Sequence, residues 1–298
     1  MIFSEIIVID SEVKMSHSPL RYPGGKYKLF RFVKSLIKEN QCNTYIEPFC
    51  GGSGLALELL IKGYVKKIIL NDFDYTIYAL WKIIVENPEQ LISMINDTSV
   101  TLDEWNNQKY IRAHQNKYSE LEIAFSTLFL NRTNRSGIID KAGPIGGKNQ
   151  DGNYKLDCRF NKNKIIENIR IIASYSNSIE VYNLEASQFL KEVVLDKEDY
   201  FIFFDPPYFK KGKELYLDFL DYQGHQQIAN VISKNLKKAK WIVTYDDADE
   251  IREMYKFVNC RPYYLQYSLQ KKQRAIELLF PSDNLLIPES ADGIQFVD

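Results

Sequence analysis

The sequence predicts an α/β fold built on a doubly wound, mostly parallel β-sheet. Short apolar runs typical of buried strands alternate with amphipathic helical stretches up to residue 86 and again after residue 176. A glycine-rich turn joins one strand to its helix, and an acidic residue follows the next strand. This order forms the nucleotide-binding half of a doubly wound sheet, in which ligands bind at the carboxyl ends of the strands.

The composition is ordinary for a globular protein. The chain has 298 residues, of which 45% are hydrophobic and 26% charged, with a net charge of −1 and a pI of about 6.4. No run of about 18 apolar residues is present, so we expect no membrane span. Residues 1–14 lack the basic region and long apolar core of a secretory signal and form an extension of unassigned role. Since there is no overall basic excess, any binding to nucleic acid requires local basic patches.

The cysteines and histidines show neither metal-ligand spacing nor a disulfide framework. We expect four reduced thiols in a cytoplasm and no metal site. His225 lies near the start of a predicted helix, where a capping or surface role is favoured over a catalytic one.

The first candidate ligand loop is Arg21-Tyr22-Pro23-Gly24-Gly25-Lys26. Proline and two glycines make a tight loop whose backbone can approach a ligand closely, and Lys26 adds a cation. Residues 29–37 follow with helical apolar spacing. The full Walker pattern is absent, so the loop does not predict a nucleoside triphosphate site.

The second candidate loop follows the strand that contains Tyr45 and includes Gly51. Ser53 is the expected N-cap of a helix over residues 55–61. Gly51 and Asp72 have about the spacing expected between a glycine turn and a ribose-binding carboxylate. Because the G-x-G-x-x-G pattern is absent, an adenosine cofactor without phosphates is favoured over a dinucleotide. A purely structural glycine turn is the alternative.

The βα rhythm stops between residues 87 and 176. Residues 113–130 have a helical pattern, and residues 131–170 carry nine basic residues against four acidic ones. Arginine and asparagine are residue types that contact base edges, and lysine and arginine also hold phosphates. We interpret residues 87–176 as a target-recognition insert; a lid, a dimerisation arm or a solvated face are alternatives. The candidate DNA-binding residues are Asn131, Arg132, Asn134, Arg135, Lys148 and Arg159.

The apolar run of residues 200–204 predicts a buried strand, and Asp205-Pro206-Pro207-Tyr208 follows it. A carboxylate can accept a hydrogen bond from an exocyclic amine, and prolines present carbonyl oxygens in fixed directions. The tyrosine ring offers a face on which an extruded base can stack. An ordinary turn is the alternative. Lys210 and Lys211 come directly after and are further candidates for phosphate contacts.

The remaining pattern completes the sheet. It predicts strands over residues 178–182 and 240–244, helices over 186–193 and 221–236, and a closing antiparallel hairpin over 263–269 and 275–280. The basic loop inside this hairpin is a further candidate for phosphate contact.

In this order the motifs resemble the DNA adenine methylase (Dam-like) family, S-adenosylmethionine-dependent enzymes that methylate adenine N6 in DNA. The likeness covers residues 19–288. It rests on the Arg21 to Lys26 loop, Glu47-Pro48-Phe49-Cys50-Gly51-Gly52-Ser53-Gly54, Asp72, Asn131-Arg132 and Asp205-Pro206-Pro207-Tyr208.

The resemblance implies a Rossmann-like methyltransferase sheet formed by residues 15–86 and 177–298, with residues 87–176 reading the DNA. S-adenosylmethionine is the implied cofactor, with S-adenosylhomocysteine as product. The implied catalytic residues are Asp205, Pro206, Pro207 and Tyr208. The implied cofactor contacts are Tyr22, Pro23, Gly24, Gly25, Lys26, Glu47, Pro48, Phe49, Gly51, Gly52, Asp72, Phe73 and Asp205.

Double-stranded DNA is the expected partner of a monomer or weak dimer, and a cognate restriction endonuclease is a further candidate partner. The segment Gly143-Pro144-Ile145-Gly146-Gly147 does not resemble the members that read GATC, so the recognised sequence stays open. An RNA or protein amide methyltransferase is the nearest alternative. A catalytically inactive DNA-binding module is the second, and a nicotinamide oxidoreductase is disfavoured by the missing third glycine.

Overall fold

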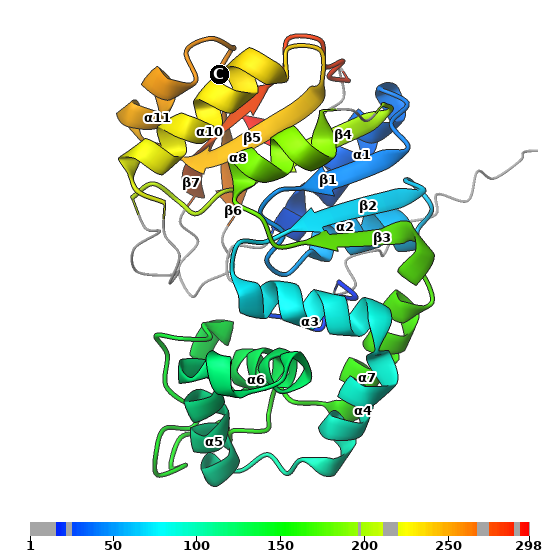
Figure 1. Cartoon of the computed structure of the whole chain (residues 1–298). Coiled ribbons are helices and arrows are strands. Elements are labelled where there is room, and N and C mark those ends of the chain that lie inside the picture. Colours follow the sequence, from blue (N-terminus) through cyan, green and yellow to red (C-terminus); the bar gives the residue numbers. More distant parts are fainter. Residues whose placement is uncertain are drawn as a thin grey trace, which may run out of the picture.

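The computed structural model describes residues 16–21, 26–195, 198–210, 220–266, 274–288 and 293–297. Its strands are β1 (Thr44–Glu47), β2 (Lys67–Asn71), β3 (Ile179–Tyr182), β4 (Tyr200–Phe204), β5 (Lys240–Asp246), β6 (Arg261–Gln266), β7 (Arg274–Pro281) and β8 (Gln295–Phe296). They form one sheet in the order β3-β2-β1-β4-β5-β7-β6-β8 (Figure 1). The first five strands of this order are parallel, and the last three join antiparallel. The prediction of a mostly parallel sheet with a closing antiparallel hairpin is confirmed.

Helices cover both faces of the sheet, which explains why the central strands are apolar on both sides. One face packs against α1 (Phe30–Glu39), α2 (Gly54–Ile61) and α3 (Tyr75–Glu86). The other packs against α8 (Ala186–Phe189), the π-turn η5 (Leu190–Val194), α10 (Tyr222–Asn235) and α11 (Asp249–Met254). Neighbouring residues of β4 alternate between the two cores: Phe201 and Phe203 belong to the first, and Ile202 and Phe204 to the second.

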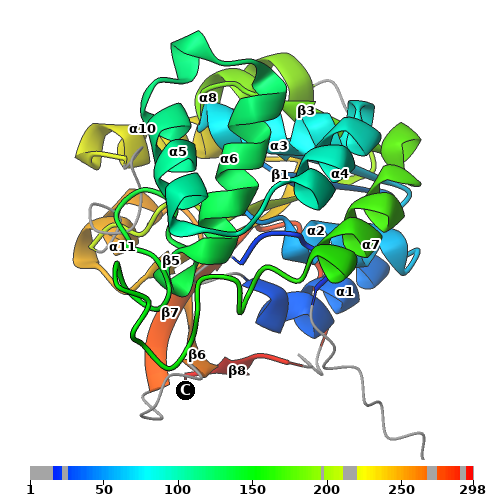
Figure 2. The ribbon, with the colours of Figure 1, turned by 90° about the horizontal axis from the view of Figure 1, so that it is seen from below.

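A group of helices separates β2 from β3 in the sequence. It comprises α4 (Pro88–Asp97), α5 (Leu102–Ala113), α6 (Glu120–Thr133) and α7 (Lys162–Ala173). The helix α6 packs along α3. The group lies below α3 in Figure 1, and it faces the viewer when the molecule is seen from below (Figure 2).

The expected helix over residues 113–130 is wrong in its first part. The helix α5 ends at Ala113, a 3-10 turn η2 (Gln115–Lys117) follows, and α6 starts only after Ser119. Ser119 and Glu122 form a capping box there: the Ser119 hydroxyl accepts from the Glu122 amide, and the Ser119 amide donates to the Glu122 carboxylate. This local signal fixes the start of α6.

Two further expectations need correction. Ser53 does occupy the N-cap of α2, but its φ of 46° is left-handed and its hydroxyl donates to the Cys50 carbonyl at 3.3 Å instead of capping the helix. His225 is buried on the inner face of α10, whose N-cap is Asp221, so neither a capping nor a surface role holds.

Among the described residues, no helix is long and apolar enough to cross a lipid bilayer.

An ion-pair network joins the helical group to the end of β2. The Arg112 guanidinium on α5 lies 2.9 Å from Asp74, the N-cap residue of α3, and 2.8 Å from Asp140 in the loop after α6. Arg112 is almost completely buried, and these carboxylates raise its pKa against the effect of burial. A buried guanidinium is stable only when it is paired, so the network fixes three segments relative to one another.

Candidate active site

Acidic residues from four parallel strands meet at one edge of the sheet. Glu47 ends β1, Asp72 follows β2, Asp205 follows β4 and Asp246 ends β5. The carboxyl ends of parallel strands lie at the same edge, which is where open α/β sheets bind their ligands. This edge brings the two predicted ligand motifs, the glycine turn and the Asp-Pro-Pro-Tyr segment, into one region.

A buried lysine is the centre of this region. Lys26 Nζ lies 3.0 Å from Asp205 Oδ1 and 3.2 Å from Glu277 Oε2, and it donates to the Tyr208 hydroxyl at 2.9 Å. Tyr208 in turn donates to Glu277 Oε1 at 2.5 Å, and Tyr263 donates to Glu277 Oε2 at 2.5 Å. We call these five residues the Lys26 cluster. It places the first sequence motif directly against the Asp-Pro-Pro-Tyr segment.

The charges in the Lys26 cluster shift its pKa values. Burial lowers the pKa of Lys26, but the negative charges around it, above all that of Asp205, raise it by more, so Lys26 remains protonated. Burial raises the pKa of Asp205 and the charge of Glu277 adds to this, while Lys26 and the Thr244 hydroxyl oppose the rise; the net pKa lies above the ordinary value. A carboxylate and a buried ammonium thus face each other in this site.

The two oxygens of Asp205 have different surroundings. Among the described residues, Lys26 and Thr244 both bind Oδ1, Thr244 Oγ1 donating at 2.9 Å. The side chain of Asp205 is 26% exposed, so the site can be reached from outside. Oδ2 is therefore the oxygen that can accept a hydrogen bond from a substrate amine.

The chain after Tyr208 is held by Asp246. The backbone amides of Phe209 and Lys210 donate to its two carboxylate oxygens at 2.8 and 3.0 Å. Phe209 packs against the His225 ring, with the ring centroids 5.4 Å apart, and His225 Nδ1 lies 2.8 Å from the Tyr245 hydroxyl. Burial lowers the pKa of His225 to about 4, so this imidazole is neutral and supports the segment by packing.

The glycine turn and Asp72 form a second part of the site. The Gly51 amide donates to Asp72 Oδ2 at 2.8 Å, and the Asp74 amide donates to Asp72 Oδ1 at 3.0 Å. The buried Trp81 indole donates to the Gly51 carbonyl at 2.8 Å. These bonds fix the carboxylate of Asp72 beside the turn.

Two observations show that this part of the site suits an adenosine-containing cofactor. Glu47 Oε2 is buried and has no hydrogen-bond partner among the described residues, so it can bind a polar group of a ligand. The ring of Phe73, next to Asp72, is 59% exposed and offers an apolar face to a flat base. Gly51, Gly52 and Pro48 are buried in the turn, and Phe49 is half-buried.

Some predicted contacts lie outside the described residues. These are Tyr22, Pro23, Gly24 and Gly25 of the first loop, and Lys211 after the Asp-Pro-Pro-Tyr segment. Pro206 is buried, whereas Pro207 and Tyr208 are half-buried.

The two asparagines predicted to bind DNA have structural roles instead. Asn131 is fully buried; it accepts from the Arg21 amide at 2.7 Å and donates to the Arg21 carbonyl at 2.9 Å. Asn134 is fully buried and binds Trp105 Nε1 at 2.7 Å and the carbonyls of residues 138 and 139. Neither amide can reach a base edge in this conformation, because both are buried and bound to other groups of the protein.

The Arg21 backbone, at the start of the first loop, is therefore held by the helical insert. Gly137 supports the same contact: its φ is +76°, and a Cβ there would lie 2.3 Å from the Arg21 carbonyl oxygen. Arg132 donates from Nε to the Pro19 carbonyl at 2.5 Å, and burial lowers its pKa to about 10. The insert thus positions the chain that leads into Lys26.

The other predicted basic residues lie on the surface. Arg135, Lys148 and Arg159 in the loops between α6 and α7 are exposed, and so is Lys210 after the Asp-Pro-Pro-Tyr segment. Lys210 Nζ donates to the Asp247 carbonyl at 2.6 Å. The exposure of these four side chains agrees with a surface that meets a phosphate backbone.

Sequence reasoning missed four residues of the site: Thr244, Asp246, Tyr263 and Glu277. Two signals were available. Thr244 and Asp246 stand at the carboxyl end of a predicted strand, where ligand-binding residues of parallel sheets gather. Glu277 is a single acid within the apolar run Ala275-Ile276-Glu277-Leu278-Leu279-Phe280, and an acid in a buried strand requires a partner.

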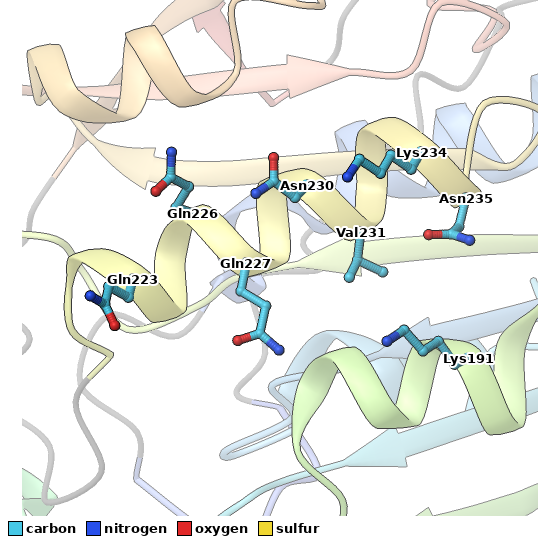
Figure 3. A pocket seen from close by; sticks show the side chains of 8 residues that line it. All are labelled: Lys191, Gln223, Gln226, Gln227, Asn230, Val231, Lys234 and Asn235. Carbon is cyan, nitrogen blue, oxygen red and sulfur yellow. The ribbon is translucent and has the colours of Figure 1, made fainter.

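A surface pocket lies elsewhere, between α10 and the turn that follows α8 (Figure 3). Its walls are mainly amide and lysine side chains, among them Gln226, Asn230, Lys191 and Lys234. None of its lining residues belongs to the Lys26 cluster or to the glycine turn, so it is separate from the site described above.

The buried Glu47 makes a testable prediction about stability and pH. Burial raises its pKa from 4.5 to about 8, and the charge of Asp205 contributes. Between these two pKa values the folded protein keeps a proton on Glu47 that the unfolded chain loses. Glu47 therefore lowers the free energy of unfolding of the wild type as the pH rises from about 5 to about 8. In Glu47→Gln the side chain is always neutral. Its free energy of unfolding should rise relative to wild type between about pH 5 and about pH 8.

Urea unfolding of both proteins at several pH values measures this difference. Glu39→Gln, the same substitution at an exposed position, is the control. A difference between Glu47→Gln and wild type that stays constant over the window would show that Glu47 ionises normally in the folded protein.

Comparison with known proteins agrees with the geometry of this site. Residues 22–274 match the family model of the D12 class N6 adenine-specific DNA methyltransferases. Type II methyltransferase M1.LlaDCHI of Lactococcus lactis subsp. cremoris is 25% identical over 268 residues, 87% of this chain and 82% of that protein. Type II methyltransferase M.MjaIII of Methanocaldococcus jannaschii is 25% identical over 209 residues, 63% of this chain and 68% of that protein.

A viral relative shows a similar extent of likeness. Type II methyltransferase M.CviBI of Paramecium bursaria Chlorella virus NC1A is 22% identical over 263 residues, 86% of this chain and 90% of that protein. The family match includes both the Asp-Pro-Pro-Tyr segment and the glycine turn. This chain belongs to the D12 class of N6 adenine-specific DNA methyltransferases, which methylate adenine at specific sites in DNA.

Proposed function

We propose that this chain transfers a methyl group from S-adenosylmethionine to N6 of an adenine flipped out of duplex DNA, and that Asp205 is its central catalytic residue. One observation carries the assignment of Asp205. Lys26 and Thr244 both bind Oδ1 of this carboxylate at the carboxyl end of β4, so that, as far as the described residues show, Oδ2 remains for the adenine amine.

Asp205 acts on the electronic state of the amine. The adenine N6 is a weak nucleophile because its lone pair is delocalised into the ring. Asp205 Oδ2 accepts one amine hydrogen, and a carbonyl of the Pro206-Pro207 turn accepts the other. The lone pair then localises on nitrogen and points at the methyl donor. Fixed acceptors and fixed positions supply most of the acceleration in such a step.

Tyr208 provides the surface for the flipped base. Its hydroxyl is bound to Lys26 and Glu277, which leaves the ring as a fixed plane. Extruding a base from the duplex costs a few kcal/mol, and stacking of the base on an aromatic ring stabilises the flipped state by about 1–3 kcal/mol. The ring therefore offsets much of the cost of base flipping.

We assign the cofactor to the glycine turn. Asp72 binds the ribose, Phe73 packs on the adenine ring, and Gly51, Gly52 and Glu47 line the remaining contacts, together with the loop of Tyr22 to Lys26. S-adenosylmethionine supplies an electrophilic methyl group on a sulfonium when it is bound there. Two observations support this assignment: Glu47 Oε2 has no hydrogen-bond partner within the part of the chain that the structure describes, and the Phe73 ring is exposed.

Asp205→Asn tests the catalytic assignment. Asparagine has the same size but presents a neutral amide, so it is a poorer acceptor for the amine hydrogen. We expect methyl transfer from labelled S-adenosylmethionine to unmethylated DNA to fall about 100-fold or more. The unfolding midpoint should fall, because the buried Lys26 loses the charge of Asp205. Cofactor affinity by calorimetry should stay close to wild type, which shows that the variant is folded under the assay conditions. The matched control is Asp283→Asn, an exposed position.

Nucleoside analysis of the labelled product separates the competing functions. Label in N6-methyladenine of DNA, lost in Asp205→Asn, supports the proposal. Label on RNA or protein instead would favour an amide or RNA methyltransferase, and bound cofactor without any transfer would indicate an inactive DNA-binding module. Full activity of Asp205→Asn would remove Asp205 from the mechanism.

We assign phosphate contacts to Arg135, Lys148 and Arg159, and expect each alanine variant to bind duplex DNA more weakly. Each lost phosphate contact should reduce the slope of log affinity against log salt by about 1, because fewer counterions are released. Lys256→Ala is the control, since Lys256 is exposed on another part of the protein. Titrations at several salt concentrations that give wild-type slopes for all three variants would place the DNA elsewhere. Three further points stay predictions. They are a phosphate contact of Lys211, a cognate restriction endonuclease as partner, and a monomeric or weakly dimeric state.

A further inference from the structure

Glu277 is a buried acid in an otherwise apolar strand. Its side chain is 2% exposed, and its neighbours on β7 include the core residues Leu278, Leu279 and Phe280. An ionised carboxylate in such surroundings is strongly unfavourable unless charges and hydrogen bonds compensate it. The sheet alone does not require an acid at this position, so the contacts of the carboxylate decide its role.

The carboxylate of Glu277 contacts both motifs of the proposed active site. Its Oε1 accepts from the Tyr208 hydroxyl at 2.5 Å, and its Oε2 lies 3.2 Å from Lys26 Nζ. Tyr263 on β6 donates to Oε2 at 2.5 Å and thereby orients the carboxylate. Glu277 belongs to neither motif, yet it binds one residue from each.

The topology of the sheet explains how a distant residue reaches this site. The strand β7 runs antiparallel beside β5, and Glu277 is paired in register with Asp246 on one side and Tyr263 on the other. β5 in turn lies beside β4, which ends at the Asp-Pro-Pro-Tyr segment. The closing hairpin therefore places the carboxylate of Glu277 at the edge of the sheet where Asp205 lies.

We propose that Glu277 is a positioning residue for methyl transfer, which fixes the Tyr208 ring and the Lys26 ammonium and through them the flipped adenine and the carboxylate of Asp205. The inference rests on the proposed function of this site. Glu277 itself touches neither the adenine nor the methyl donor.

Physical reasons support a positioning role for both partners. A tyrosine ring can turn about two side-chain bonds, and the bond from its hydroxyl to a buried carboxylate removes much of this freedom. Lys26 also lies 4.8 Å from the centre of the Tyr208 ring and is held between Asp205 and Glu277. If Glu277 is neutral, Lys26 loses one of the two carboxylates that pair with it among the described residues, and both the ring and Asp205 can shift.

Single-turnover methylation with four proteins tests the proposal: wild type, Glu277→Gln, Tyr208→Phe and the double variant. At saturating cofactor and DNA, we expect Glu277→Gln to react about tenfold or more slowly, since a misplacement of about 1 Å can cost about 100-fold in such steps. The double variant should lose less than the product of the two single losses, because Glu277 acts in part through the Tyr208 hydroxyl. The affinities for DNA and cofactor should change much less than the rate.

A fluorescence measurement distinguishes a positioning role of Glu277 from a merely structural one, because it reports on the flipped base itself. 2-Aminopurine in place of the target adenine reports on the stacking of the flipped base, and its emission in the complex should differ between wild type and Glu277→Gln. Glu253→Gln, at an exposed position, is the matched control for the loss of charge.

The outcomes separate the proposal from its premise. Wild-type protein without activity on DNA would refute the proposed function itself. Active wild type with a normal rate in Glu277→Gln, or with losses that multiply fully in the double variant, would overturn the role of Glu277. If Glu277→Gln does not fold, the rate of Tyr208→Phe tests the proposal. The proposal requires this variant to methylate DNA more slowly than wild type, and a wild-type rate overturns it.

Discussion

Lys26 carries a positive charge that is almost completely buried, and such a charge is stable only when opposite charges surround it. Asp205 approaches it from the end of β4, and Glu277 from β7. The pairing therefore requires the antiparallel hairpin to close against β5. The same interaction joins three segments that are far apart in the sequence, and it fixes Oδ1 of Asp205.

The helical insert contributes to the site from the opposite side. Asn131 holds the backbone of Arg21, a few residues before Lys26, and Arg112 holds Asp74, two residues after Asp72. The insert therefore supports the chain on both sides of the proposed cofactor position, in addition to carrying exposed basic residues. The insert and the sheet form one packed structure, because helix α6 contacts both α3 and the backbone of Arg21.

Much of the fold could be predicted because its signals are local. The parallel strands are continuous apolar runs. The family resemblance implies a common site for Asp72 and Asp205, and both follow parallel strands, whose carboxyl ends share one edge of the sheet. The amides of Asn131 and Asn134 were misassigned, since residue type alone does not show whether an amide binds a base or a buried backbone. Glu277 was missed because its partners, Lys26 and Tyr208, come near it only through the sheet order β4-β5-β7.

A crystal structure of the protein with S-adenosylhomocysteine and a duplex carrying the recognised site tests most directly how Asp205 is used. We predict the flipped adenine N6 about 3 Å from Asp205 Oδ2, with Lys26 and Thr244 still on Oδ1. The adenine ring should stack on Tyr208. An amine bound to Oδ1, or Lys26 displaced from Asp205, would contradict the role that we assign to the Lys26 cluster.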